Sequence, residues 1–224
     1  MENETFANDA LVNINGEQIP TLELLLMLTL ISLLPSLLIM CTSFLRTIIM
    51  LSFLRNAMGI QQSPPNMVLV GIALFLTLYI MTPVIDEINE TAYQPYIREE
   101  ITQREAWTRA QVPLKEFMLR NTGEDTLNLF MDMANEEIVE EAVDLPLTVV
   151  IPSFMTEELK RAFTAGFLLY IPFLLIDIIV SSTLMSMGMM MLPPAMISLP
   201  FKLLLFVTVD GWQLLFSSIV TGFN

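Results

Sequence analysis

Apolar residues gather in four long segments of this chain, and polar residues gather between them. The segments cover residues 22–54, 67–85, 162–185 and 195–220. A helix crosses the apolar layer of a bilayer with about 20 residues, and each segment is close to or beyond that length. Pro35 predicts a kink or a break in the first segment. The pattern predicts an all-α chain built from membrane-type helical hairpins with kinked and broken helices.

Two turns join these segments in pairs. The first covers residues 59–66, where Pro64-Pro65 ends a helix and Asn66 can cap the next one. The second covers residues 184–194 and holds five methionines among eleven residues, with no charge. Methionine side chains are flexible and polarisable, so they suit a seal that deforms and repacks. The simpler alternative, that they fill gaps in a hairpin turn, stays open.

Residues 86–161 form an acidic insert between the apolar hairpins. Seven Lys/Arg against 17 Asp/Glu leave this stretch with a net charge of −10. Charged and apolar residues alternate at helical spacing over 99–120, and Pro113 predicts a division into two helices. A further helix is expected after Thr122-Gly123, a short β-prone piece at 149–152, and a helix start at Thr156. The charges are typical of a solvated surface more than of a binding site.

The charge pattern sets the domain organisation and the expected topology. We divide the chain into a polar N-terminal arm (1–20), a first apolar hairpin (21–85), the acidic insert (86–161) and a second apolar hairpin with the Met-rich turn (162–224). The arm lacks the basic start of a signal peptide. Positive residues favour the cytoplasmic side, so a conventional four-span arrangement places the arm and the insert outside the cytoplasm.

Composition and charge exclude several classes of protein. Hydrophobic residues make up 54% of the 224 residues and charged residues 15%, which is typical of an integral membrane protein. The net charge of −14 argues against nucleic-acid binding. With one cysteine and no histidine, neither an intrachain disulfide nor a Cys/His metal site is expected. No phosphate-binding loop or nucleophile motif is present, so we expect no catalytic residues, no cofactor and no enzyme.

Four charged residues inside the apolar segments are candidate functional residues. Arg46 lies inside the first segment and Arg55 directly follows it, and the simplest expectation is that both side chains extend to the cytoplasmic interface of the membrane. Asp177 stands alone in the third segment, and Lys202, across the methionine turn, is its nearest plausible partner. Two interpretations of this pair stay open, a lock within the hairpin and a role at a subunit interface.

The chain also resembles the FliP family, the flagellar export-gate proteins of bacteria, which is related to the SctR proteins of injectisomes. The resemblance covers nearly all of the chain from about residue 24. It rests on Thr42-Ser-Phe-Leu-Arg46, Leu54-Arg-Asn-Ala57, Pro64-Pro-Asn66, Phe75-Leu-Thr77, Pro83-Val-Ile-Asp86, Ala92-Tyr-Gln-Pro95, Pro113-Leu-Lys-Glu-Phe-Met-Leu-Arg120, residues 152–167, Pro172-Phe-Leu-Leu-Ile-Asp177, Met187-Gly-Met-Met-Met-Leu-Pro-Pro194, Leu199-Pro-Phe-Lys-Leu203 and Val209-Asp-Gly-Trp212. The motifs within the insert favour the flagellar branch.

The resemblance implies a pore subunit. Several copies would assemble with FliQ and FliR into a closed, helically arranged cone in the bacterial inner membrane, within the flagellar basal body and raised toward the periplasm. FlhB and FlhA would be further partners, FliO an assembly factor, membrane lipid a surrounding component, and unfolded flagellar proteins the substrates. The family's channel gasket maps onto Met189, Met190 and Met191, and its buried charge pair onto Asp177 and Lys202. Arg46 and Arg55 match basic positions that are possible interface residues.

Two alternatives remain from the sequence. One is the injectisome homologue, which shares the membrane motifs. The other is a small secondary transporter that uses Asp177 as its coupling carboxylate. Such transporters carry matching broken segments in two halves, and the first half of this chain shows no repeat of the methionine turn.

Overall fold

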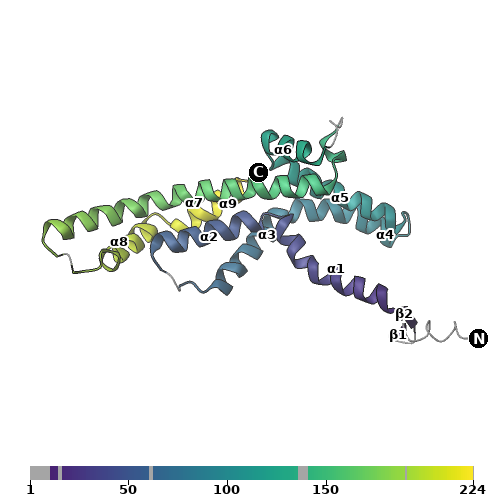
Figure 1. The fold of residues 1–224 in the computed structure, drawn as a ribbon, viewed down its shortest axis with the longest axis horizontal. Coiled ribbons are helices and arrows are strands. Elements are labelled where there is room, and N and C mark those ends of the chain that lie inside the picture. Colours follow the sequence, from purple (N-terminus) through teal and green to yellow (C-terminus); the bar gives the residue numbers. More distant parts are fainter. Residues whose placement is uncertain (1–10, 15–16, 61–62, 136–140, 190, 224) are drawn as a thin grey trace, which may run out of the picture. The chain divides into compact units, whose positions relative to one another are not determined.

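The computed structural model describes residues 11–14, 17–60, 63–135, 141–189 and 191–223 and is mainly helical (Figure 1). The helical fold class is thereby confirmed. The chain divides into two compact units, Met1–Ile39 and Met40–Asn224.

The first unit departs from a purely helical fold. Strands β1 (Leu11–Ile14) and β2 (Glu17–Pro20) pair antiparallel, with Leu11 opposite Pro20 and Ile14 opposite Glu17. Helix α1 (Thr21–Met40) follows and continues through Pro35. A break at Pro35 is therefore wrong, because the chain leaves the helix only at residues 41–43. A proline removes one hydrogen-bond donor, and long apolar helices tolerate this loss.

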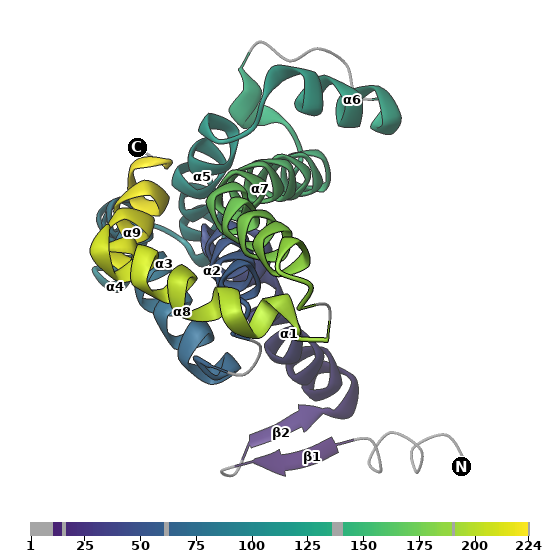
Figure 2. The same ribbon diagram turned by 90° about the vertical axis from the view of Figure 1, so that its left-hand side faces the viewer.

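Helix α2 (Phe44–Met58) occupies the middle of the second unit. Its buried residues recur every three or four positions, as in Thr47, Met50, Leu54 and Met58, so one side of the helix faces the core. Helix α7 (Leu147–Ser186) packs along α2, and α3 (Asn66–Ile88) also contacts it. Figure 2 shows α2 between these two helices. The core is formed mainly by aliphatic side chains, methionines and phenylalanines from α2, α3, α5, α7, α8 and α9.

The acidic insert is folded onto an extension of α3. The helix continues through a π-helical turn, η1 (Asn89–Tyr93), into α4 (Gln94–Ile97). Helix α5 (Gln103–Arg120) then returns along α3 and η1. Helix α6 (Glu124–Ala134) begins directly after Gly123, as expected, and a short 3-10 turn, η2 (Ala142–Asp144), leads into α7.

Three local expectations within the insert are wrong. Pro113 does not divide a helix, since α5 runs through it and buries it. Residues 149–152 are not β-structure but part of the first two turns of α7, where Val149 and Val150 are fully buried. Thr156 lies inside the same helix and does not start one. In each case tertiary packing overrides a local preference, which is about 3 kcal/mol for a proline inside a helix and about 1 kcal/mol or less for the other two.

The fourth apolar segment is two helices. Helix α8 (Pro194–Thr208) and helix α9 (Gly211–Thr221) meet at an angle of 63°. Asp210, at the break, has a left-handed backbone with φ of 51°. A side chain at Gly211 would clash, because its Cβ would lie 2.2 Å from the Phe206 ring. The sharp bend therefore depends on glycine at this position.

Among the described residues, fewer than four helices are able to span a membrane by length and composition. Within the described residues, two helices are long and apolar enough, one covering Asn66–Ile97 and the other Leu147–Ser186, or three if α8 and α9 form one bent span. Helix α2 has only 15 residues and carries Arg46 and Arg55. The conventional four-span arrangement therefore does not match these helices.

The close approach of α7 to α2 generates a prediction about Gly166. A Cβ at this position would lie 2.6 Å from the ring of Phe53 on α2. We expect Gly166→Ala to lower the free energy of unfolding by about 1–3 kcal/mol, the usual cost of overpacking. Thermal melting of the purified chain in mild detergent measures the effect.

Gly71→Ala is the matched control. Gly71 lies inside α3, and no described atom is within 4 Å of a Cβ built there. This substitution should leave the stability unchanged or raise it by up to about 1 kcal/mol, because alanine favours helix more than glycine does. Equal melting temperatures for both variants would contradict tight α2–α7 packing at Gly166.

Candidate functional site

The methionine turn is the end of the hairpin formed by α7 and α8. Helix α7 ends at Ser186, and Gly188 adopts a left-handed backbone with φ of 74°. The Gly188 N–H donates to the Met185 carbonyl and the Met189 N–H to the Leu184 carbonyl. These two bonds form a Schellman motif, which satisfies the last carbonyls of the helix. Pro194 then begins α8, so the turn is closed by backbone chemistry at both ends.

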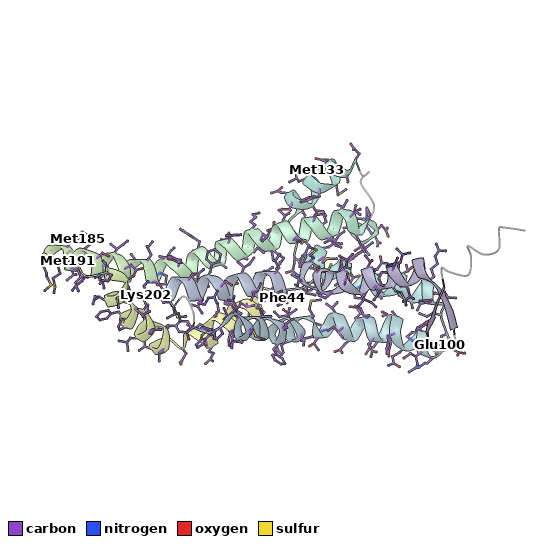
Figure 3. The ribbon with its side chains drawn as sticks, turned by 60° about the horizontal axis from the view of Figure 1, so that its bottom comes forward. Phe44, Glu100, Met133, Met185, Met191 and Lys202 are labelled. Carbon is purple, nitrogen blue, oxygen red and sulfur yellow. The ribbon has the colours of Figure 1, made fainter. Side chains whose placement is uncertain are left out.

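The methionine side chains of this turn are uncovered in the single chain. Met191 is 99% exposed and Met189 is 44% exposed. Met190 lies outside the described residues. Figure 3 shows Met185 and Met191 together at the end of the hairpin, with Lys202 set back from it. Because apolar side chains gain free energy when they leave water, this turn is a surface that favours contact with other apolar groups.

The structure brings Asp177 and Lys202 together behind this turn. The Lys202 ammonium lies 2.6 Å from an Asp177 carboxylate oxygen, and the Ser198 hydroxyl donates to the other oxygen at 2.6 Å. The lysine side chain is 6% exposed and the aspartate side chain 32%. The pair therefore joins α7 to α8 close to their shared turn.

Lys202 also attaches the hairpin to α2. Its ammonium donates to the carbonyl of Ala57 at 3.1 Å, in the last turn of α2. The carbonyls at a helix C-terminus have no partner within the helix and carry partial negative charge, so a cation is favourable there. One buried lysine thus connects three helices.

Arg46 forms the second buried charge centre, and its partner was not found from the sequence. Its Nε donates to a Glu158 carboxylate oxygen at 2.9 Å, and its Nη2 donates to the other oxygen. Both side chains are buried, and that of Glu158 is fully so. The expectation that Arg46 extends to an interface is therefore wrong for the single chain. Glu158 lies two residues after the helix start that the sequence predicts at Thr156, and nothing in that prediction indicates that it is the carboxylate partner that a buried arginine requires.

The same arginine holds the end of the chain. Its Nη1 donates to the Gly222 carbonyl at 2.8 Å, and its guanidinium carbon lies 3.7 Å from the centre of the Phe223 ring. These contacts combine a hydrogen bond with a cation–π interaction. Arg46 therefore joins α2, α7 and the residues after α9.

Arg55 stands apart from both centres. It donates from Nη1 to the Asn66 side chain, which links the end of α2 to the start of α3. Among the described residues no carboxylate pairs with it. The expected cap by Asn66 is not formed in α3, where no side-chain cap bond is present. Arg55 thus remains a partly exposed cation near the turn between these helices.

The chemistry of these groups is suited to holding helices, not to transforming a substrate. The two most buried cations each have a carboxylate and a carbonyl as acceptors. A buried charge with satisfied hydrogen bonds fixes the packing of the elements that supply it. The site is therefore a rigid, internally paired stem that carries an exposed methionine turn.

Comparison with known proteins identifies similar chains. The model of the FliP family matches residues 27–219. The flagellar biosynthetic protein FliP of Aquifex aeolicus (strain VF5) is 50% identical over 211 residues, which cover 93% of this chain and 88% of that protein. The protein of the same name from Bacillus subtilis (strain 168) is 52% identical over 203 residues, with 91% and 92% covered. The one from Pectobacterium carotovorum subsp. carotovorum is 49% identical over 211 residues, with 93% and 82% covered.

The Arg46–Glu158 pair generates a stability prediction. Glu158→Ala should leave a buried arginine without its carboxylate, and breaking such a pair costs about 3–5 kcal/mol. We expect a large loss of melting temperature in detergent. Glu105→Ala is the control, because Glu105 forms an exposed pair with Arg109 that is expected to contribute about 0.3–0.5 kcal/mol. Similar losses for the two variants would show that the buried pair does not hold the helices together.

Proposed function

The chain belongs to the FliP family of flagellar biosynthetic proteins, and on that premise we propose that it is a structural pore subunit of the flagellar type III protein export gate. In this proposal several copies assemble with FliQ and FliR around a channel for unfolded flagellar substrates. The methionine turns of the copies converge and form the gasket of that channel.

One observation carries the proposal: the methionine turn is exposed while the stem behind it is fixed. Met191 has almost no neighbours within the chain, whereas Lys202 ties α7, α8 and α2 together a short way behind it. A gasket needs these two properties, since its tip must move around a passing chain while its frame stays in place. Unbranched, polarisable methionine side chains suit the moving part, because they can repack against one another and against varied substrates.

The mechanism is passive gating. Met189, Met190 and Met191 from the assembled copies close the pore against ions, in the manner of an apolar constriction. An unfolded polypeptide displaces these side chains and is surrounded by them. Energy comes from the proton-motive force through other components, with FlhB and FlhA as further partners and FliO as an assembly factor. The chain itself acts without catalysis.

The proposed location is the bacterial inner membrane, in the flagellar basal body, with the gate raised toward the periplasm. The exposed apolar side chains of α3, α7 and α8 support burial against lipid or other chains. The charges and prolines within these helices support burial against protein, because lipid-facing helices seldom hold such groups. Contact with neighbouring copies satisfies both requirements.

Native mass spectrometry after co-expression with FliQ and FliR tests the assembly. We expect one large species that holds several copies of this chain and both partners. Asp177→Ala should lower its yield, because Lys202 then keeps only the Ala57 carbonyl as an acceptor. Asp132→Ala, at an exposed position on α6, makes the same charge change and should leave the yield unchanged. If the chain is instead a monomer or dimer that does not bind FliQ or FliR, and it catalyses solute flux when reconstituted alone into vesicles, the result would favour a transporter.

The gasket assignment predicts an ion leak. Replacing Met189, Met190 and Met191 together with alanine should shorten the side chains at the constriction and raise the resting conductance of membranes that contain the assembled gate. The complex should still form, because the stem contacts are retained. Met133→Ala, at an exposed methionine on α6, is the control. Unchanged conductance in the triple variant would overturn the assignment.

A further inference from the structure

A pocket of about 460 Å³ lies between α3, α5, α7 and the residues that follow α9. Its walls include Pro83 and Phe117, the ring of Phe223, and two arginines, Arg120 and Arg161. It is separate from the methionine turn and from the Lys202 centre. The function proposed above assigns it no role.

The charge around this pocket is positive, although the chain as a whole is strongly negative. Arg161 shares its carboxylate, Glu157, with Lys160, and both contacts are long at 3.4 Å. Glu157 also accepts a hydrogen bond from Thr126 at 2.8 Å. One carboxylate is therefore divided among three donors. The Arg161 guanidinium keeps donors free for another acceptor.

Arg120 has no acidic partner in the part of the chain that the structure describes. Glu116 lies one turn earlier on α5, Asp86 and Glu87 follow Pro83 on α3, and Glu124 begins α6, but none of these acids forms an ion pair with Arg120. Arg46, behind Phe223, is neutralised by Glu158. Arg120 and Arg161 are the charged residues in the described lining of the pocket, so this lining carries a charge of +2 in a chain of −14.

The pocket lies where both candidate spans change from apolar to charged. Arg161 is the last charged residue before the uncharged run 162–176 of α7. On α3, Pro83 comes at the end of an uncharged run that stops at Asp86. In a bilayer, this change from apolar to charged residues coincides with the layer of lipid phosphates, where arginine and lysine are favourable.

An exposed apolar stripe leads away from the pocket along α3. Phe75, Tyr79 and Pro83 are spaced four residues apart, so they share one side of the helix. All three are exposed, and Pro83 also lines the pocket. An anion held by the arginines would therefore adjoin an apolar track that is free in the single chain.

We propose that this pocket binds the phosphate of an anionic phospholipid, with Arg120 and Arg161 as the donors and an acyl chain along the Phe75–Tyr79–Pro83 stripe. Charge complementarity and position together select this occupant. A guanidinium matches phosphate oxygens in a bidentate geometry, and the surrounding positive charge disfavours a zwitterionic headgroup relative to an anionic one. The lipid would bind to the pocket and the stripe before the chain assembles with other chains, when the stripe has no protein partner.

Native mass spectrometry of the purified chain in detergent, titrated with phosphatidylglycerol or phosphatidylcholine, tests the site. The wild-type chain should retain one phosphatidylglycerol molecule, and phosphatidylcholine should bind at least tenfold more weakly. Arg120→Gln with Arg161→Gln should weaken phosphatidylglycerol binding on the order of tenfold. Arg98→Gln with Arg104→Gln, at two exposed positions of the insert, makes the same charge change and should leave binding unchanged.

Any one of four results would overturn the proposal. Equal binding of the two lipids, or equal binding by the two double variants, would exclude a specific anionic headgroup. Saturation by inorganic phosphate, with no added affinity from the acyl chains, would identify a free anion as the ligand. The wild-type chain could also bind no lipid and form a dimer that is lost only in the Arg120/Arg161 double variant. That result would assign the pocket to a carboxylate of a second copy. If the double variant does not fold, Arg120→Gln alone carries the test, since Arg120 holds no described ion pair.

Discussion

The packing of the second unit depends on how the buried positive charge of Arg46, on the short central helix α2, is neutralised. Arg46 lies buried in the first turn of α2, and a guanidinium there is tolerated only when acceptors surround it. Glu158 supplies two of these acceptors from α7, and the Gly222 carbonyl supplies a third from the end of the chain. A shift of α7 along α2 would break both bonds to Glu158. Apolar packing alone allows several registers, and this pair selects one of them.

Lys202 applies the same constraint at the other end of α2. Its contacts with Asp177 and the Ala57 carbonyl fix the α7–α8 hairpin against the helix C-terminus. The Schellman motif at Gly188 closes the turn, but no contact among the described residues covers Met191. The contacts that fix the hairpin are therefore made around Lys202, whereas the described methionines of the turn are exposed.

Much of this arrangement could be predicted from the sequence, but the pairing of charges only in part. The helical class follows from apolar segments long enough to span a bilayer, and Asp177 suggests Lys202 because they flank one turn. Glu158 was missed because it lies 112 residues from Arg46, and no local pattern reports such a contact. The helix break predicted at Pro113 is wrong because the cost of a proline in a helix is a local effect, whereas the burial of Pro113 depends on tertiary packing that the sequence does not show. The pairing of β1 with β2 could have been predicted, since the sequence Asn15-Gly16 between two short runs is a strong turn signal.

The distribution of charge explains why a chain with so much exposed apolar surface has one defined fold. Its most buried cations, Arg46 and Lys202, pair with carboxylates of the same chain, so the fold of a single copy does not depend on a charge from another chain. Among the described residues, two kinds of group keep capacity for further contacts, namely the exposed apolar faces of α3, α7 and α8, and the arginines that line the pocket at the boundary of the insert. Apolar faces bind without strict direction, whereas arginines demand an acceptor at a fixed place. A membrane supplies both an apolar layer and a layer of phosphates at the right level. In this proposal a lipid-covered single chain is a physically complete state, and the proposed assembly would exchange that lipid for protein.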